Sequence, residues 1–250
     1  MVIRREDLVR AQRAQAPGAW RRATTAPVRA GTTGSGESLL VLTWSAADLT
    51  RERAAGARLL GRLGIRTGMR VANTLAGALI TPGSLLLGDV IEDLGALDIP
   101  LGAIESEAAA RQAWELVDRV QPDVLVLEPA SAPRFFAAAP TAARPWWGGI
   151  VWLRRGGVAV AVPVVPDTVG FTGWQSTWLA VPEVACFVAS SCSAQRFHVD
   201  DGVGAEVLDD TLVLTRLEGD PPLRFATGIA ARTLVPVCAC GTPGPGLELA

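Results

Sequence analysis

Two kinds of apolar pattern alternate along the first 140 residues. Short continuous apolar runs are each followed by a longer segment in which apolar residues recur at helical spacing. Continuous apolar strands are typical of parallel sheets covered on both faces, and strands alternating with helices indicate βαβ units. The pattern predicts an α/β fold: a mainly parallel sheet with flanking helices. Expected strands lie at 39–43, 69–75, 99–104 and 124–127, and expected helices at 46–63, 106–120 and 132–139, with a further helix ending at 94.

The pattern changes near residue 140, where Pro, Gly and Trp accumulate and helical spacing fades. These features and the β-branched runs that follow predict a smaller β-rich subdomain. The runs lie at 150–153, 158–165, 205–208 and 212–217. The expected organisation is a helical lead-in over 1–30, an α/β subdomain over 31–145 and a β-rich subdomain over 146–250.

Composition and charge exclude several classes of function. The 23 basic residues are all arginines, the net charge is -2, and 49% of the residues are hydrophobic. This balance predicts a sizeable core and argues against nucleic acid as a partner. The N-terminal segment lacks the apolar core of a secretory signal, and no apolar run reaches the ~20 residues that a membrane helix needs. We therefore expect a cytoplasmic protein with no membrane partner.

The segment from Gly31 to Ser38 consists almost entirely of Gly, Thr and Ser. Glycine lets a backbone approach a ligand closely, and successive N–H groups and hydroxyls in a turn form a concave anion site. The segment predicts a phosphate-binding loop, with an ordinary surface turn as the alternative. It is not a Walker loop, which requires a lysine that this chain lacks. The candidate phosphate-binding residues are Gly31, Thr32, Thr33, Gly34, Ser35 and Gly36.

All four cysteines and the single histidine lie in the last quarter or so of the chain. Cys238 and Cys240 are one residue apart, and Cys192 and His198 supply a second pair. A structural zinc ion is held by four such ligands in a tetrahedron, so this set predicts a zinc site. Buried thiols that pack as small hydrophobes are the alternative, and the spacing leaves open whether Cys186 joins the site.

Glu183 lies in an apolar stretch close to Cys186. A buried carboxylate requires a partner. The sequence leaves two partners open, a metal such as Mg²⁺ or an arginine. Because the one histidine is assigned to the zinc set, histidine acid–base catalysis has no further candidate, and no catalytic residue is predicted.

Several motifs occur in an order that resembles one enzyme family. Gly31-Thr32-Thr33-Gly34 resembles a Ser-Gly-Thr-Thr-Gly phosphate loop with Ala30 at the leading Ser, and 222–228 resembles Pro-x-x-Arg-Tyr-x-Thr-Gly. Further matches lie at 64–71, 94–100, 121–124 and 212–217, and Cys192, His198, Cys238 and Cys240 resemble a zinc site that some members carry. Over roughly residues 29–246 the chain resembles the phenylacetate–CoA ligase branch of the adenylate-forming (AMP-binding) enzymes.

The resemblance implies a substrate class, cofactors and site residues. Members use ATP and Mg²⁺ to convert a carboxylate into an acyl-adenylate, pass the acyl group to the thiol of coenzyme A, and often dimerise. The resemblance implies that the loop and Arg224 meet nucleotide phosphates and that an acid near Glu183 helps to place Mg²⁺. The chain departs from the family in having Ile229 at the ribose-binding Asp, no readable Tyr-Gly-x-Thr-Glu motif and no lysine. The lid domain that carries the family's lysine is expected to be absent.

Three functions are consistent with these features. The preferred one is a lid-less relative without full ligase activity. It binds an acyl or aromatic carboxylate, a nucleotide-like ligand or a protein partner in a biosynthetic pathway, and a homodimer is compatible with it. The alternatives are an active carboxylate-adenylating subunit that a partner completes, and a structural zinc module.

Overall fold

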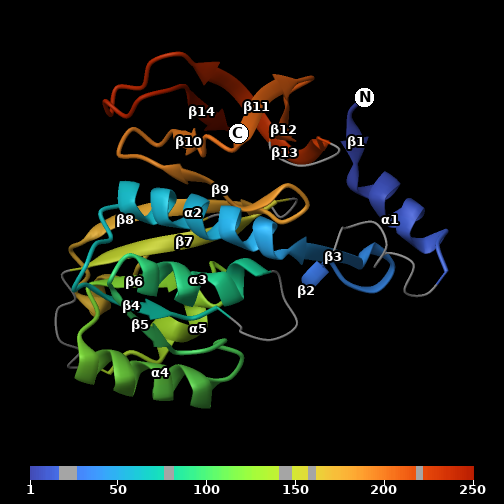
Figure 1. The fold of residues 1–250 in the computed structure, drawn as a ribbon. Coiled ribbons are helices and arrows are strands. Elements are labelled where there is room, and N and C mark those ends of the chain that lie inside the picture. Colours follow the sequence, from blue (N-terminus) through green and yellow to red (C-terminus); the bar gives the residue numbers. More distant parts are fainter. Residues whose placement is uncertain (17–26, 76–81, 141–147, 157–161, 218–221) are drawn as a thin grey trace.

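The computed structural model describes residues 1–16, 27–75, 82–140, 148–156, 162–217 and 222–250. A run of parallel strands forms the centre of the molecule (Figure 1). Every residue of β6 is buried, as expected for a strand covered on both faces. The predicted α/β fold with a mainly parallel sheet is confirmed. In spatial order the strands are β5 (Leu97–Pro100), β4 (Arg70–Asn73), β6 (Val124–Leu127), β7 (Gly149–Arg155) and β8 (Trp174–Val181).

Helices cover both faces of this sheet (Figure 1). α2 (Ala46–Arg62) and α3 (Pro82–Asp93) pack on one face, and α4 (Glu107–Val120) and α5 (Ala132–Ala137) pack on the other. The Ser45 side chain accepts a hydrogen bond from the Asp48 backbone N–H, and Ser106 accepts one from Ala109. These N-terminal caps fix where α2 and α4 begin, close to the boundaries that the sequence predicts.

α2 approaches the sheet closely at Gly56. A Cβ atom on Gly56 would lie 2.7 Å from Val90 Cγ2 and 3.0 Å from the Phe187 ring. Phe187, on strand β9 (Ala185–Ser191), stacks on Trp178 with ring centroids 4.7 Å apart. Because the interior is close-packed, the missing side chain of Gly56 sets the distance between α2 and the sheet.

Beyond β8 the sheet becomes antiparallel and has a core of its own. The β11–β12 hairpin turns at Asp209 and Asp210, which both have positive φ, a conformation that Asp tolerates in such turns. A β-rich part therefore follows the parallel part, although β7 and β8 extend the parallel sheet past the expected boundary after residue 145. After β9 the strands are β10 (Phe197–Val199), β14 (Gly246–Leu249), β13 (Arg224–Val235), β12 (Thr211–Arg216) and β11 (Val203–Leu208).

The N-terminal segment joins the two parts. β1 (Ile3–Arg4) pairs in parallel with β13 and leads into α1 (Arg5–Arg13). β2 (Pro27–Thr33) and β3 (Leu40–Ser45) form a separate hairpin, with a 3₁₀ turn at Gly36–Ser38. The Gln12 side chain exchanges hydrogen bonds of 2.8 and 2.9 Å with the Val41 backbone. α1 is thereby tied to the hairpin that carries the predicted phosphate loop (Figure 1).

Some elements differ from the predictions. The strand expected at 99–104 is found earlier, as β5 at Leu97–Pro100. These four residues pair with the four residues of β4. Of the run at 158–165, residues 158–161 lie outside the described residues and the remainder is not a strand. The apolar pattern does not indicate β8, whose first half is polar. Within the described ranges, no helix has the length and apolar character needed to cross a membrane.

Candidate functional site

The predicted zinc ligands come together in the structure. Cys192 follows β9, His198 lies in β10, and Cys238 and Cys240 lie in the connection between β13 and β14. Their ligand atoms all lie within 4.8 Å of one another. The Cys192 and Cys238 Sγ atoms are 3.7 Å apart, and Cys240 Sγ is 3.2 Å from His198 Nε2. Cys186 is not part of this group, because it is buried in the core beside α2 and α3.

The geometry and chemistry of this Cys/His group fit a metal ion. Two sulfurs bound to one zinc at ~2.3 Å in a tetrahedron are separated by roughly 3.8 Å, close to the observed Cys192–Cys238 distance. Hydrogen bonds from the Thr242 side chain and backbone lower the pKa of the Cys240 thiol to about 6, which favours the thiolate that binds metal. The Cys240 backbone N–H lowers the pKa of Cys238, but burial and the neighbouring thiols outweigh it and raise that pKa.

His198 is oriented as a ligand through Nε2. Its Nδ1 atom is buried and has no hydrogen-bond partner among the described residues. Pairing of His198 with Ser190 and Gly246 fixes the backbone on both sides. A divalent ion held by Nε2 and three sulfurs would satisfy this donor set, so the group can hold one metal ion of the kind that thiolate and imidazole prefer.

The predicted phosphate loop is the turn of a β-hairpin, and half of it is strand. Gly31, Thr32 and Thr33 lie in β2, paired with Leu42, Val41 and Leu40 of β3. Gly34 and Ser35 form the turn, and Gly36 opens the 3₁₀ segment. The loop expected to precede a strand is therefore shorter than the sequence predicts, because its first residues have backbone partners in the ladder.

A guanidinium group fills the inner side of this turn. Arg5, the first residue of α1, donates hydrogen bonds of 2.8 Å to the carbonyl oxygens of Thr33 and Ser38. A Cβ atom on Gly34 would lie 2.6 Å from the Ser38 oxygen and closer still to the Arg5 guanidinium, and Gly34 has a φ of +78°. Glycine is required there by both backbone conformation and space. The turn presents carbonyl acceptors to a cation on this side.

Glu183, the predicted Mg²⁺-site acid, pairs with the same arginine. Its carboxylate accepts a hydrogen bond from Arg5 Nη1, and the Glu183 side chain is buried. Of the two partners that the sequence left open, the arginine is the one in contact. Burial lowers the pKa of Arg5 from its ordinary value, but this group still carries its charge at neutral pH. Arg5 therefore links the loop, the acid and α1.

Arg224, the other predicted phosphate ligand, pairs with a neighbour on the sheet. Its Nε and Nη2 atoms donate to the Glu206 carboxylate at 2.6 and 2.7 Å. This bidentate pair bridges β13 and β11 and lowers the pKa of Glu206. Ile229, at the position of the family's ribose-binding Asp, is buried in the core of the β-rich part.

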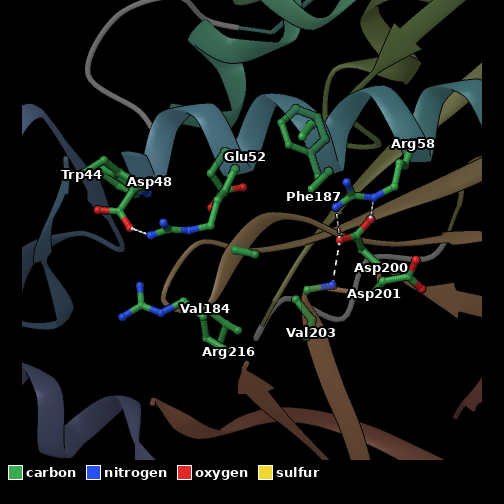
Figure 2. Close-up of a pocket in the computed structure, with 15 residues that line it drawn as sticks. Trp44, Asp48, Glu52, Arg58, Val184, Phe187, Asp200, Asp201, Val203 and Arg216 are labelled. Atoms are coloured by element: carbon green, nitrogen blue, oxygen red, sulfur yellow. Dashed lines mark hydrogen bonds and ion pairs between the residues drawn. The ribbon is translucent and has the colours of Figure 1, made fainter. Parts of the chain in front are cut away.

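A cavity of about 390 Å³ lies between α2 and the β-rich part (Figure 2). Glu52 of α2 is buried at its wall and accepts a hydrogen bond of 2.9 Å from the Cys186 backbone N–H. Burial raises the pKa of Glu52 to about 7, although backbone hydrogen bonds and Arg216 oppose the shift. Sequence reasoning missed Arg5, Glu52 and this cavity, because their partners are distant in the chain.

No family model and no curated protein matches the chain, whereas solved structures match nearly all of it. An open form of 2-hydroxyisobutyryl-CoA ligase, in complex with 2-HIB-AMP and CoA, superposes with a TM-score of 0.80 at 19% identity over 99% of this chain. A long-chain-fatty-acid-CoA ligase, FadD1 from Archaeoglobus fulgidus, gives 0.62 at 10% over 88%. Escherichia coli MenE, bound to an analogue of OSB-AMS, gives 0.55 at 10% over 90%.

The chain has the fold of the adenylate-forming enzymes. It covers 62%, 50% and 49% of the three solved chains, respectively, so it corresponds to part of each. At these identities the likeness concerns the fold alone. The fold predicted from the motif order is therefore confirmed, and the comparisons do not single out the phenylacetate–CoA ligase branch.

Proposed function

We propose that this chain is an adenylate-forming-type core of the phenylacetate–CoA ligase branch that binds a small acyl or nucleotide-like ligand and does not complete ligase turnover by itself. The fold and the order of the family-like motifs support the first part of the proposal. The contact of Arg5 with Glu183 and with both ends of the loop carries the second part.

Arg5 competes with the Mg²⁺ ion that the resemblance places beside Glu183. An acid that helps to place Mg²⁺ must offer its carboxylate to the ion, but Glu183 already has a cationic partner. Separating the pair costs on the order of 2–3 kcal/mol, less than for a fully buried pair, because the Arg5 side chain keeps 28% exposure. That is about a 30- to 150-fold loss in affinity for an Mg²⁺–nucleotide complex.

The proposal separates three outcomes in one set of measurements on the wild-type protein. We expect AMP, MgATP or an aromatic carboxylate at millimolar concentration to raise the Tm by mass action. We also expect ATP–pyrophosphate exchange to stay at background. Exchange at the rate of an active ligase contradicts the proposal and supports an adenylating enzyme. A Tm that responds to none of these ligands contradicts it and supports a structural zinc module.

We further propose that the Cys/His group holds zinc, the metal that three thiolates and an imidazole in a closed site favour. Its role would be structural, since it joins β10 to the β13–β14 connection. Protein purified without chelator is expected to contain about one equivalent of zinc, which Cys240→Ser reduces severalfold. Cys186→Ser is the matched control and keeps the metal. Equal zinc content in both variants contradicts the assignment.

A further inference from the structure

The cavity in Figure 2 is separate from both the Cys/His group and the hairpin loop. It lies between α2, the start of β9, the β10–β11 turn and the end of β12. Val184 and Ala185 at its wall directly follow Glu183 in the chain. Its volume of about 390 Å³ is within the range of small-molecule sites.

Three arginines line the cavity, and two of them have carboxylate partners. Arg51 pairs with Asp48. Arg58 donates from Nε and Nη2 to the Asp200 carboxylate at 2.9 and 2.8 Å. Asp200 is almost fully buried and also accepts a hydrogen bond from the Gly202 N–H. These two pairs balance their own charges and therefore offer a ligand little net attraction.

Arg216, at the end of β12, is the third. It forms no ion pair in the part of the chain that the structure describes, and its Nε atom is buried without a hydrogen-bond acceptor. Its charge favours the carboxylate forms of Asp48 and Glu52, although burial still raises the pKa of Glu52. Figure 2 shows Arg216 beside Val184, on the side of the cavity away from the Arg58–Asp200 pair. Because Arg216 lines the cavity without a carboxylate partner among the described residues, an anionic ligand in the cavity would supply one to its guanidinium group.

The rest of the lining selects the kind of anion. Apolar side chains form much of the wall, including Trp44, Val184, Phe187 and Val203. The other acids are Glu52, which is held by the Cys186 N–H, and Asp201, which is exposed. One guanidinium facing the Asp48 carboxylate suits a monoanion better than a phosphate dianion, and the planar fork of arginine matches a carboxylate.

We propose that this cavity binds an organic monocarboxylate with an apolar or aromatic body, with Arg216 receiving the carboxylate. The inference rests on the proposed function for the class of ligand and adds the place and the residue that recognise it. Trp44 and Phe187 would contact the body of the ligand, and the two balanced Arg–Asp pairs would remain as they are.

The test is calorimetric titration of the wild-type protein with 3-phenylpropionate, its uncharged amide, acetate and inorganic phosphate. A ligand of this size in a single pocket is expected to bind with a Kd of about 1 mM. The amide, which cannot accept a charge-assisted bidentate bond, should bind at least tenfold more weakly. Acetate lacks the apolar body and should be similarly weak. Undetectable binding of the acid, equal binding of acid and amide, or tighter binding of phosphate would each overturn the proposal.

Variants locate the binding site. Arg216→Met, which keeps the aliphatic stem, should weaken 3-phenylpropionate at least tenfold. Arg53→Met is the matched control: it removes a guanidinium from α2, outside the cavity lining and paired with Asp93, and should change affinity less than twofold. Ala54→Trp places a large ring at an exposed position of the cavity lining and should block binding of the acid. This second variant tests the assignment even if Arg216→Met does not fold. Unchanged affinity in a folded Arg216→Met or Ala54→Trp protein contradicts the assignment.

The two proposals fail separately. Pyrophosphate exchange by a protein that binds the acid through Arg216 contradicts the proposed function alone. Stabilisation by nucleotide without any binding of the acid contradicts the cavity assignment alone.

Discussion

Glu52 gives a quantitative prediction about stability and pH. This carboxyl is buried on α2, where the Cys186 N–H donates to Oε2 at 2.9 Å and the Phe187 N–H also donates to it. Burial raises its pKa from 4.5 to about 7 in the folded protein. In the unfolded chain the carboxyl is exposed to water and titrates near its ordinary value.

The raised pKa means that the folded protein binds this proton more tightly than the unfolded chain does. The contribution of Glu52 to stability is therefore fully present below about pH 4.5, is lost as the pH rises towards 7, and is constant above that. A difference from 4.5 to about 7, at ~1.4 kcal/mol per pH unit, corresponds to a loss of about 3 kcal/mol at most.

Glu52→Gln removes this dependence. The amide oxygen still accepts one backbone N–H, but the second acceptor is lost, at a cost of about 1 kcal/mol. At pH 5 the variant is expected to be slightly less stable than wild type. At pH 8 it is expected to be about 2 kcal/mol more stable, because wild type must keep a charged carboxylate buried there.

Urea unfolding of both proteins at pH 5 and pH 8 measures the effect. For each protein, the unfolding free energy at pH 8 is subtracted from that at pH 5, and the variant's change is then subtracted from that of wild type. This cancels the other titrating groups and should leave about 2.5 kcal/mol. Glu115→Gln, at an exposed position on α4, is the control and should give less than ~0.5 kcal/mol. If Glu52→Gln keeps the full pH dependence of wild type, the carboxyl is not buried in uncharged form and the reasoning is wrong.

Three further predictions concern packing and charge. Gly56→Ala should destabilise the protein by about 1–3 kcal/mol, because its Cβ would press on Val90 and Phe187; Gly61→Ala, on the same helix with no atom near its Cβ, should raise stability by about 0.5–1 kcal/mol. Equal effects of the two in thermal unfolding would refute the close contact of α2 with β9. Asp200→Ala should lower stability by about 2 kcal/mol and Asp200→Asn by less, since the Asn side chain can still accept a hydrogen bond from the Gly202 N–H. If Asp200→Ala leaves the unfolding free energy in urea unchanged, the Arg58–Asp200 pair does not stabilise the protein. Chelation of the proposed zinc should lower the Tm, measured by calorimetry, of wild type and of Cys186→Ser but not that of Cys240→Ser. An identical shift in all three proteins would show that the effect of the chelator does not come from the Cys/His group.

The parts of this structure that follow local patterns can be predicted from the sequence. The buried strand at Val124–Leu127 and the helix at Glu107–Val120 need only a continuous apolar run and an apolar stripe with a Ser cap. The Cys/His group could be proposed from residue types, because three cysteines and the single histidine between 192 and 240 have the residue types of a structural zinc site, and the structure brings their ligand atoms within 4.8 Å of one another.

What cannot be predicted depends on contacts between distant residues. Arg5 meets Glu183 only because β1 pairs with β13 and brings α1 to the hairpin loop. The Gly/Thr/Ser composition of the loop predicts a tight turn, as found at Gly34, but not that the Thr33 and Ser38 carbonyls face a cation. The cavity likewise exists only where α2 and the end of β12 come together.

The role of Arg5 is the central claim, and the response of Tm to MgATP in wild type and in Arg5→Met tests it most directly. Without Arg5, Glu183 is a buried acid that lacks its partner, and Mg²⁺ can take that place. We predict a small MgATP-dependent rise in wild type, a rise larger by several degrees in Arg5→Met, and no such gain in Arg5→Met/Glu183→Gln. A wild-type response to MgATP as large as that of Arg5→Met would contradict the claim that Arg5 holds this site closed to the metal–nucleotide complex.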